Sequence, residues 1–381
     1  MISLSNQFIA PGQTIGIIGG GQLGRMMALA AKEAGFRVVV LDPSPDSPCG
    51  QVADQQIIAS YHDESALEEL AEKSDVITYE FENIDYKALK KISQKSYIPQ
   101  GAELIRITQD RIIEKAAIEE AGIKVAPYKV IDSLESLREA AHHLGFPCVL
   151  KTARGGYDGK GQYVMHTPEE ISEASILLSH GSCVLEAWVP FEKEVSVIVT
   201  RNPSGEMKCF PMGENIHVNN ILHQTIVPAR TEDTIKEKAS DIAIALAGHL
   251  QLVGTLAVEM FVTRDGSVFV NELAPRPHNS GHYTIEACEI SQFAQHIRAI
   301  CSWPLKSTEL LKPAVMVNIL GQHTEELYTW ISRQPEWSIH LYGKEKAKAN
   351  RKMGHITTLT NDMEATLKEL NEHEIWKIPV R

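Results

Sequence analysis

The sequence predicts an α/β amino-terminal domain followed by two α+β segments, and two patterns carry this prediction. From residue 14 to about residue 100, short apolar runs alternate with amphipathic helical segments, as in a parallel sheet with right-handed crossovers. The following stretch, to about residue 303, is richer in β-branched strands, and a smaller tail of mixed character begins at Pro304. We therefore expect domains at residues 1–107, 108–303 and 304–381.

The elements of the first segment follow one another in regular order. "TIGIIG" (residues 14–19) has the continuous apolar character of a buried strand, and "LGRMMALAAKEAG" (23–35) predicts a helix that ends at Gly35. The remaining runs predict a strand at residues 36–42, a helix at 66–74 and a strand at 75–81.

The turn after the first strand carries a glycine motif. Gly19, Gly21 and Gly24 have the spacing G-x-G-x-x-G, and Asp42 ends the second strand. This pattern is typical of dinucleotide-binding turns, where the backbone approaches a pyrophosphate and an acidic residue binds the ribose. An NAD-dependent oxidoreductase is therefore one hypothesis.

The second segment begins with a charged helical stretch at about residues 105–125. "RDG" at residues 264–266 separates two apolar runs and predicts a hairpin turn. Strands are expected at residues 148–153, 161–166, 194–201 and 255–263.

Composition and charge exclude several classes of protein. The 381 residues are 43% hydrophobic and 23% charged, which is ordinary for a soluble globular protein. The net charge of -12 argues against non-specific binding of nucleic acid or of a membrane surface. Six cysteines lie scattered without a C-x-x-C pair, and neither a leader-like amino terminus nor a membrane-length apolar run is present. We expect a cytoplasmic protein with reduced thiols.

A second glycine-rich stretch carries the strongest chemical signal. "LKTARGGYDGKGQ" (residues 150–162) places Lys151 at the end of an apolar strand, and Lys160 lies within the glycine-rich loop. Glycines let backbone N–H groups approach a polyphosphate, and the lysines supply positive charge. The loop is not a Walker A motif, because Gly161 follows Lys160 where Ser or Thr is required. A flexible hairpin with a solvated lysine is the alternative.

Two glutamates on neighbouring apolar strands form a second constellation. Glu259 and Glu272 flank the predicted hairpin, so antiparallel pairing can bring both carboxylates to one face. Like charges placed this way repel unless a cation joins them, and Mg²⁺ commonly binds through carboxylates and substrate phosphates. Asn271 can add an oxygen. The alternative is a surface hairpin with solvated glutamates, although both residues lie among apolar neighbours where an unpaired charge is costly.

These residues, with "EAWVPFEKE" (186–194), resemble the ATP-grasp superfamily. Within it, "GIIGGGQLGRMM", "TYEFENI", "GGYDGKGQ", "NELAPRPHNSGH" and "RKMGH" occur in an order similar to the ATP-dependent carboxylases of purine biosynthesis, over nearly the whole chain. The resemblance implies a Rossmann-like pre-ATP-grasp domain, a central ATP-grasp fold and a small mixed carboxyl-terminal domain.

The resemblance also implies a reaction. ATP phosphorylates bicarbonate to carboxyphosphate, and the exocyclic amine of aminoimidazole ribonucleotide is carboxylated, by CO₂ released in the site. Such phosphoryl transfer depends on positioning and charge neutralisation more than on a nucleophilic side chain. We expect ATP with Mg²⁺ or Mn²⁺, the two small-molecule substrates, a homodimer, and neither nucleic acid nor membrane as partner.

By position, the resemblance assigns nucleotide and metal contacts. Glu259 and Glu272 would hold the metal, Glu186 and the backbone of residues 187–189 would bind adenine, and Glu194 the ribose. The expected ATP contacts are Arg111, Lys151, Gly156, Tyr157, Asp158, Gly159, Lys160, Gly161, Gln162, Glu186, Ala187, Trp188, Val189, Glu194, His217, Asn271 and Glu272.

Other residues would serve the second substrate and the chemistry. Arg276 would meet bicarbonate or carboxyphosphate, His278 and Asn279 would line the reaction chamber, and Tyr157 and Asp158 would position the amine or bicarbonate. Asp158 and His278 are both candidates for handling the amine proton. The expected contacts to the ribonucleotide are Gly21, Gln22, Leu23 and Glu82, with Lys344, Arg351 and Lys352 at its phosphate.

Several alternatives stay open at this point. His217 and His278 can be structural histidines, and Arg111 can pair with Glu114 along one helix. Residues 344–352 can be a solvated basic stretch, and Glu82 can serve loop packing. For the whole chain, a formate-dependent glycinamide ribonucleotide transformylase and a nucleotide sensor compete, although "QLG" at residues 22–24 differs from the "ELG"-like loop of the former. The oxidoreductase hypothesis leaves Lys151 and the glutamate pair unexplained.

Overall fold

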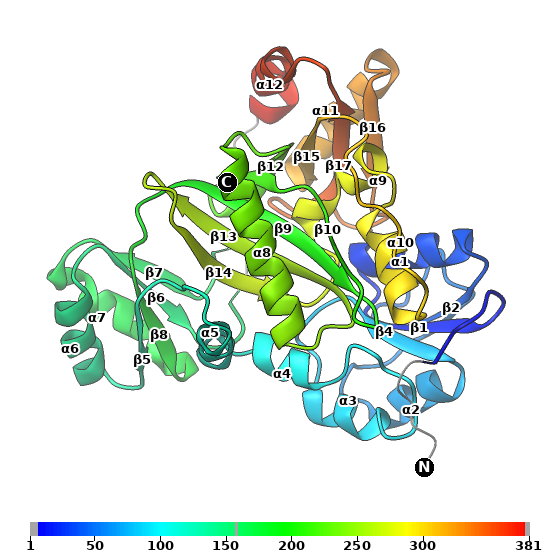
Figure 1. Ribbon diagram of the computed structural model, residues 1–381, viewed down its shortest axis with the longest axis horizontal. Helices are drawn as coiled ribbons and strands as arrows, with labels where there is room; N and C mark the ends of the chain where they lie inside the picture. Colours follow the sequence, from blue (N-terminus) through cyan, green and yellow to red (C-terminus); the bar gives the residue numbers. More distant parts are fainter. Residues whose placement is uncertain (1–6, 157–158, 378–381) are drawn as a thin grey trace.

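The computed structural model describes residues 7–156 and 159–377, which form three β-sheets. The amino-terminal sheet, the small sheet and the large sheet follow one another along the chain (Figure 1). In the described ranges, no helix has the length and apolar character needed to cross a membrane.

The amino-terminal sheet is parallel and has the order β3 (Gln55–Ile57), β2 (Arg37–Leu41), β1 (Thr14–Ile18) and β4 (Val76–Tyr79). Its helices are α1 (Gln22–Glu33), α2 (Glu64–Glu72), α3 (Tyr86–Ile92) and α4 (Glu103–Thr108). The predicted order of strands and helices is confirmed. Helix α1 ends where predicted, because Gly35 adopts a φ of +85° that side chains disfavour.

The small sheet is antiparallel, with the order β5 (Tyr128–Ile131), β8 (Cys183–Ala187), β6 (Cys148–Thr152) and β7 (Gln162–Met165). Helix α5 (Arg111–Glu120) leads into it from the amino-terminal domain. Its apolar core is shared with α6 (Leu134–Leu144), α7 (Ile171–Ala174) and the short 3₁₀ segment η2 (Ser175–His180). A further 3₁₀ segment, η1 (Pro168–Glu170), precedes α7.

The large sheet runs from the second predicted segment into the carboxyl-terminal segment. Its first strands are β14 (Val268–Ala274), β13 (Gly254–Thr263), β9 (Phe191–Arg201), β11 (Gly213–Val218) and β12 (Ile221–Val227), with β10 (Met207–Cys209) beside β9. Strand β12 pairs with β15 (Ala314–Leu320), which continues to β17 (Lys352–Leu359) and β16 (Trp337–Leu341). Helix α8 (Asp233–His249) lies across one face of this sheet (Figure 1).

Helix α10 (Gln292–Ile300) links the large sheet to the amino-terminal domain. Its residues Phe293, Ile297 and Ile300 belong to the same core as Met27 of α1. The other elements are α9 (Thr284–Ala287), α11 (Thr324–Trp330), α12 (Met363–Glu372) and the 3₁₀ segments η3 (Asn279–Gly281), η4 (Gly321–His323), η5 (Ile331–Arg333) and η6 (Glu374–Lys377). The domain boundaries predicted at residues 107 and 303 stay predictions. Helix α10, which precedes residue 303, packs on the amino-terminal domain, and strand β15, which follows it, continues the large sheet.

Candidate active site

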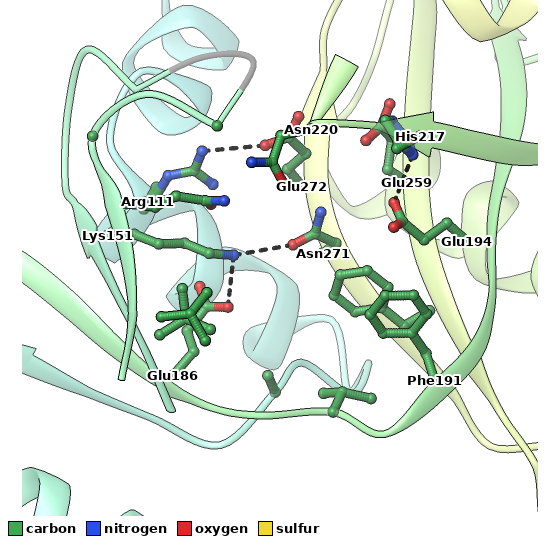
Figure 2. Close-up of a pocket in the computed structure, with 18 of the residues that line it drawn as sticks. Arg111, Lys151, Glu186, Phe191, Glu194, His217, Asn220, Glu259, Asn271 and Glu272 are labelled. Atoms are coloured by element: carbon green, nitrogen blue, oxygen red, sulfur yellow. Dashed lines mark hydrogen bonds and ion pairs between the residues drawn. The ribbon is translucent and has the colours of Figure 1, made fainter. Parts of the chain in front are cut away.

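A cavity of about 260 Å³ lies between the small sheet and the large sheet. It contains predicted residues from eight strands and from helix α5, brought together from distant parts of the chain. Figure 2 shows several of them. Of the predicted residues, it is lined by Arg111, Lys151, Gly159, Lys160, Gly161, Gln162, Glu186, Ala187, Trp188, Val189, Glu194, His217, Glu259, Asn271, Glu272, His278, Asn279 and Lys352.

The glutamate pair lies on opposite strands at one end of the hairpin. Glu259 of β13 is directly opposite Glu272 of β14, as the sequence predicts. The next pair is Met260 with Val270, so Asn271 is an extra residue in β14. Successive side chains of a regular strand point to opposite faces, but a bulge breaks this alternation. The bulge therefore lets Asn271 and Glu272 both face the cavity, a detail that residue spacing alone cannot predict.

The charges around Glu259 suit a cation. Burial, together with the negative charge of Glu272, raises the pKa of Glu259 to about 7. His278 Nε2 lies 3.3 Å from Glu259 Oε1, and His278 Nδ1 accepts the Ser280 N–H at 3.3 Å. Burial, with Arg276 nearby, lowers the pKa of His278 well below its usual value, so the neutral ring carries its proton on Nε2, facing the carboxylate.

The carboxylate of Glu186 pairs with two lysines. Its Oε2 lies 2.9 Å from Lys151 Nζ, and its Oε1 lies 2.9 Å from Lys115 Nζ. Burial opposes ionisation of Glu186, but the two ammonium groups outweigh it and lower the pKa to about 2. Both carboxylate oxygens meet lysines, and the role of Glu186 at adenine stays a prediction. Lys151 Nζ also donates to Asn271 Oδ1 at 3.3 Å, which spans the two sheets (Figure 2).

Arg111 pairs with Glu272 across the cavity, and Glu114 accepts a backbone hydrogen bond from strand β14. Arg111 Nη2 lies 3.2 Å from Glu272 Oε2, where the sequence also allowed pairing with Glu114. Glu114 Oε1 instead accepts the Leu273 N–H at 2.8 Å. Strand β14 is at the edge of its sheet, so this buried carboxylate satisfies a backbone donor that no strand can pair. Burial raises the pKa of Glu114 to about 8.

The sequence does not predict the aromatic pair in the apolar part of the cavity. The rings of Phe191 and Phe261 stack with centroids 4.5 Å apart. Phe261 lies two residues after Glu259 on β13, so the period of two was an available signal. Glu194 Oε2 lies 3.0 Å from His217 Nδ1, and this carboxylate raises the pKa of His217 although burial alone would lower it. The other apolar lining residues are Ala126, Val149, Val164 and Leu222.

The second glycine-rich loop lies against a tight turn of the large sheet. Asn219 and Asn220 have φ of 51° and 62° and form the two-residue turn between β11 and β12. Gly159 has a φ of +77°, and a Cβ there would lie 2.6 Å from Asn220 Cβ. Tyr157 and Asp158 lie outside the described residues, so their predicted roles stay predictions.

The backbone N–H groups of the first glycine motif are hydrogen-bonded to a side chain of the protein itself. The Gly24 N–H donates to Glu80 Oε2 at 2.7 Å, and the Gly21 N–H donates to the same carboxylate. A Cβ on Gly21 would lie 2.6 Å from Glu80 Oε1, so the glycine makes room for this side chain. The sequence predicted that this turn binds substrate through Gly21, but its N–H is engaged by Glu80. The prediction for the neighbouring side chains of Gln22 and Leu23 stays untested.

The carboxylate of Asp42 also accepts hydrogen bonds from the protein's own backbone. The Gly20 N–H donates to its Oδ2 at 2.7 Å and the Ser44 N–H to its Oδ1 at 2.8 Å. A buried carboxylate at the start of α1 would repel a pyrophosphate, which argues against the NAD hypothesis.

The predicted substrate residues fall into separate groups. Arg276 Nε donates to Glu82 Oε2 at 2.8 Å, so these two predicted residues pair with each other across the domain junction. Lys352 lines the cavity. Lys344 Nζ donates to the Lys352 carbonyl at 2.7 Å, and the exposed Arg351 donates to the Lys346 carbonyl at 3.2 Å.

Family models match most of the chain. A ribonucleotide synthetase preATP-grasp domain matches residues 12–109, and an ATP-grasp domain matches residues 116–293. A phosphoribosylaminoimidazole carboxylase C-terminal domain matches residues 314–369.

Similar proteins cover nearly the full length. The N5-carboxyaminoimidazole ribonucleotide synthase of Bacillus subtilis (strain 168) is 55% identical over 367 residues, 96% of this chain and 97% of that protein. A crystal structure of an N5-carboxyaminoimidazole ribonucleotide synthetase with ADP is 58% identical, with a TM-score of 0.96 over 97% of this chain and 98% of the other. The Aspergillus clavatus synthase with ADP and aminoimidazole ribonucleotide is 32% identical, with a TM-score of 0.88 over 96% and 98%. By these similarities, the chain belongs to the N5-carboxyaminoimidazole ribonucleotide synthase family of ATP-grasp proteins.

Proposed function

We propose that the chain uses ATP and bicarbonate to carboxylate the exocyclic amine of 5-aminoimidazole ribonucleotide, giving N5-carboxyaminoimidazole ribonucleotide by way of carboxyphosphate. The observation that carries this proposal is the cavity in which Lys151 and Arg111 face the Glu259 and Glu272 pair. Positive groups beside paired carboxylates suit a nucleotide polyphosphate with its divalent cation. The ADP and aminoimidazole ribonucleotide named for the A. clavatus relative give the substrates.

The cavity provides separate places for the parts of ATP. The stacked Phe191 and Phe261 and the apolar lining would cover adenine, with the backbone of residues 186–189 providing polar contacts. Glu194, held by His217, would accept from ribose hydroxyls. Lys151, Arg111 and the loop of residues 156–162 would neutralise and enclose the phosphates.

Mg²⁺ fits Glu259 and Glu272. The two carboxylates lie opposite each other and offer hard oxygen donors, and burial together with the charge of Glu272 raises the pKa of Glu259. In the part of the chain that the structure describes, no group of three or more acidic, histidine or cysteine side chains has metal-binding geometry. Two carboxylates with substrate phosphates and water are a usual Mg²⁺ environment. The bound ion would neutralise charge on the transferring phosphoryl group.

The chain's own residues would then act on the second substrate. His278 is neutral and presents an N–H from Nε2 at the mouth of the carboxylate pair. Arg276, fixed by Glu82, would hold bicarbonate or carboxyphosphate, and Asn279 would line the chamber. Lys352, with Lys344 and Arg351, would bind the ribonucleotide phosphate. Tyr157 or Asp158 would complete the chamber over the amine.

The test is release of ADP in bicarbonate buffer with Mg²⁺, measured with and without 5-aminoimidazole ribonucleotide. We expect ADP release that the ribonucleotide stimulates, matched by carboxylated product. Stimulation by formate with glycinamide ribonucleotide would support the transformylase alternative instead. Absence of any substrate-stimulated ADP release would refute both. We also propose a homodimer, which sedimentation of the purified chain would test.

A further inference from the structure

A buried charged triad lies beside the cavity, and only part of it faces the cavity. Glu186 is 3% exposed and forms ion pairs with both Lys115 and Lys151, each with an N–O distance of 2.9 Å. Lys151 lines the cavity, whereas Lys115 is not among the described lining residues and is fully buried. The site described above assigns no role to Lys115.

The charges of this triad do not cancel. Two ammonium groups and one carboxylate leave one unit of positive charge, whereas a Glu186–Lys151 pair alone would be neutral. All three groups are buried, so their field is screened less by water and salt than that of surface lysines. The surplus charge therefore acts on whatever occupies the cavity next to Lys151.

The geometry holds Lys115 in place and leaves Lys151 directed at the cavity. Lys115 comes from α5, and its ammonium lies 5.6 Å from the centroid of the Tyr128 ring. Tyr128 in turn donates to Glu119 of the same helix at 3.1 Å. Lys151 Nζ contacts Glu186 and Asn271, which uses two of the three donors of an ammonium group. The third donor can serve a ligand.

We propose that Lys115 is a positioning residue for nucleotide binding: by occupying one oxygen of Glu186, it leaves Lys151 with a net positive charge for the polyphosphate of the nucleotide. This inference rests on the proposed ATP site. It predicts that Lys115 contributes to binding of the phosphates and not to binding of the nucleoside.

The experiment compares ADP with adenosine as ligands of the full chain, by calorimetry in Mg²⁺ buffer. Lys115→Met makes the triad neutral, so we expect ADP affinity to fall by about tenfold or more, with adenosine affinity within about twofold. The matched control is Lys129→Met, which removes the same charge from an exposed position on β5, the neighbour of the strand that carries Glu186. It is expected to leave both affinities unchanged.

A charge-restoring variant separates electrostatics from packing. Lys115→Met with Glu186→Gln again leaves one positive charge, on Lys151, and buries no unpaired carboxylate. We expect it to regain most of the ratio of ADP affinity to adenosine affinity. This double variant tests the inference by itself if Lys115→Met alone does not fold.

Three results would overturn the inference. They are an equal loss of ADP and adenosine affinity in Lys115→Met, an unchanged ADP affinity in it, or a double variant whose affinity ratio stays tenfold below that of the parent. Failure of the parent chain to bind ADP would instead refute the proposed ATP site, so the two failures are distinguishable.

Discussion

The side-chain amides of Asn279 and Asn318 hydrogen-bond to each other in both directions, at 2.9 and 2.7 Å. Asn279 lines the cavity, and Asn318 comes from β15 of the carboxyl-terminal segment. Asn318 Nδ2 also donates to the Leu222 carbonyl at 2.8 Å, which fixes its orientation. The continuous large sheet thus lets the carboxyl-terminal segment orient a predicted chamber residue.

Asn318→Leu tests this relationship. The substitution leaves the buried amide of Asn279 unpaired, at a cost of about 1–3 kcal/mol in folding free energy. We expect kcat for carboxylation to fall by about tenfold to a hundredfold, because the chamber side chain loses its orientation. The KM for ATP should change little, since other elements form the nucleotide contacts. Steady-state kinetics and thermal unfolding measure the two effects.

Gln224→Leu is the matched control for that variant. Gln224 is buried on β12 and donates to Asn371 at 2.9 Å, another contact between the same segments that involves no chamber residue. We expect similar destabilisation with normal kcat. An equal loss of kcat in both variants would assign the effect to general loosening of the junction.

Gly159→Ala tests the contact between the glycine-rich loop and the Asn220 turn. Its φ of +77° imposes strain of about 1–2 kcal/mol on any side chain, and its Cβ would lie 2.6 Å from that of Asn220. We expect the loop to be pushed off the turn and the KM for ATP to rise by about tenfold or more.

Gly155→Ala separates the strain from the clash. Gly155 has a φ of +78°, but a Cβ there would meet nothing within 4 Å. The same backbone penalty is therefore expected with a KM for ATP close to that of the parent. If the two variants raise this KM equally, the contact with Asn220 is not what positions the loop.

Glu259→Gln should make the folded protein more stable and its activity more dependent on Mg²⁺. An amide removes the repulsion between the two opposed carboxylates, so the thermal midpoint in EDTA should rise. The same change weakens the proposed Mg²⁺ contact, so a much higher Mg²⁺ concentration should be needed for half-maximal activity. Paired measurements of unfolding and Mg²⁺ dependence check both. A variant that is less stable in EDTA, with unaltered Mg²⁺ dependence, would contradict the assignment.

His296 should make the junction with the amino-terminal domain sensitive to acid. Its Nδ1 accepts the Thr255 N–H at 3.1 Å, and its Nε2 lies 2.8 Å from Thr78 Oγ1. Burial lowers its pKa to about 3, whereas an unfolded histidine titrates near about 6.5. Below that pH the unfolded chain binds a proton that the folded chain does not. This contribution to stability is therefore complete above about pH 6.5 and is lost as the pH falls toward 3, by about 1.4 kcal/mol per pH unit.

Urea unfolding at pH 7 and pH 5 measures this effect. His296→Gln should reduce the difference in unfolding free energy between the two pH values by about 2 kcal/mol. The exposed His166→Gln should leave the difference as in the parent. Indistinguishable pH dependence in the parent and His296→Gln would refute the assignment.

Local patterns predicted much of the candidate site. Glu259 and Glu272 could be paired from the sequence because both lie near one short turn in apolar strands. The glycine-rich loop could be recognised because its glycines lie close together in the chain. The family resemblance supplied the remaining expected nucleotide contacts, including Glu194 and His217, which line the same cavity.

Contacts between distant segments could not be predicted in this way. Lys115 looks like any lysine of a charged helix until α5 packs beside β8. Glu80 ends an apolar strand, and only the folded domain places it over the glycine turn. Arg276 and Glu82 were each predicted at the substrate, but their pairing depends on how two domains meet.

The sequence by itself determined the order of elements, the glycine loops, the opposed carboxylates and the family. These follow from periodicity, turn chemistry and local spacing, which act over a few residues. Only the tertiary structure decided which polar groups pair: Glu80 with the first glycine turn, Glu186 with Lys115 and Lys151, and Asn279 with Asn318. Burial makes an unpaired polar group costly, so partners are selected by the packing of whole elements, and packing is not encoded in any one segment.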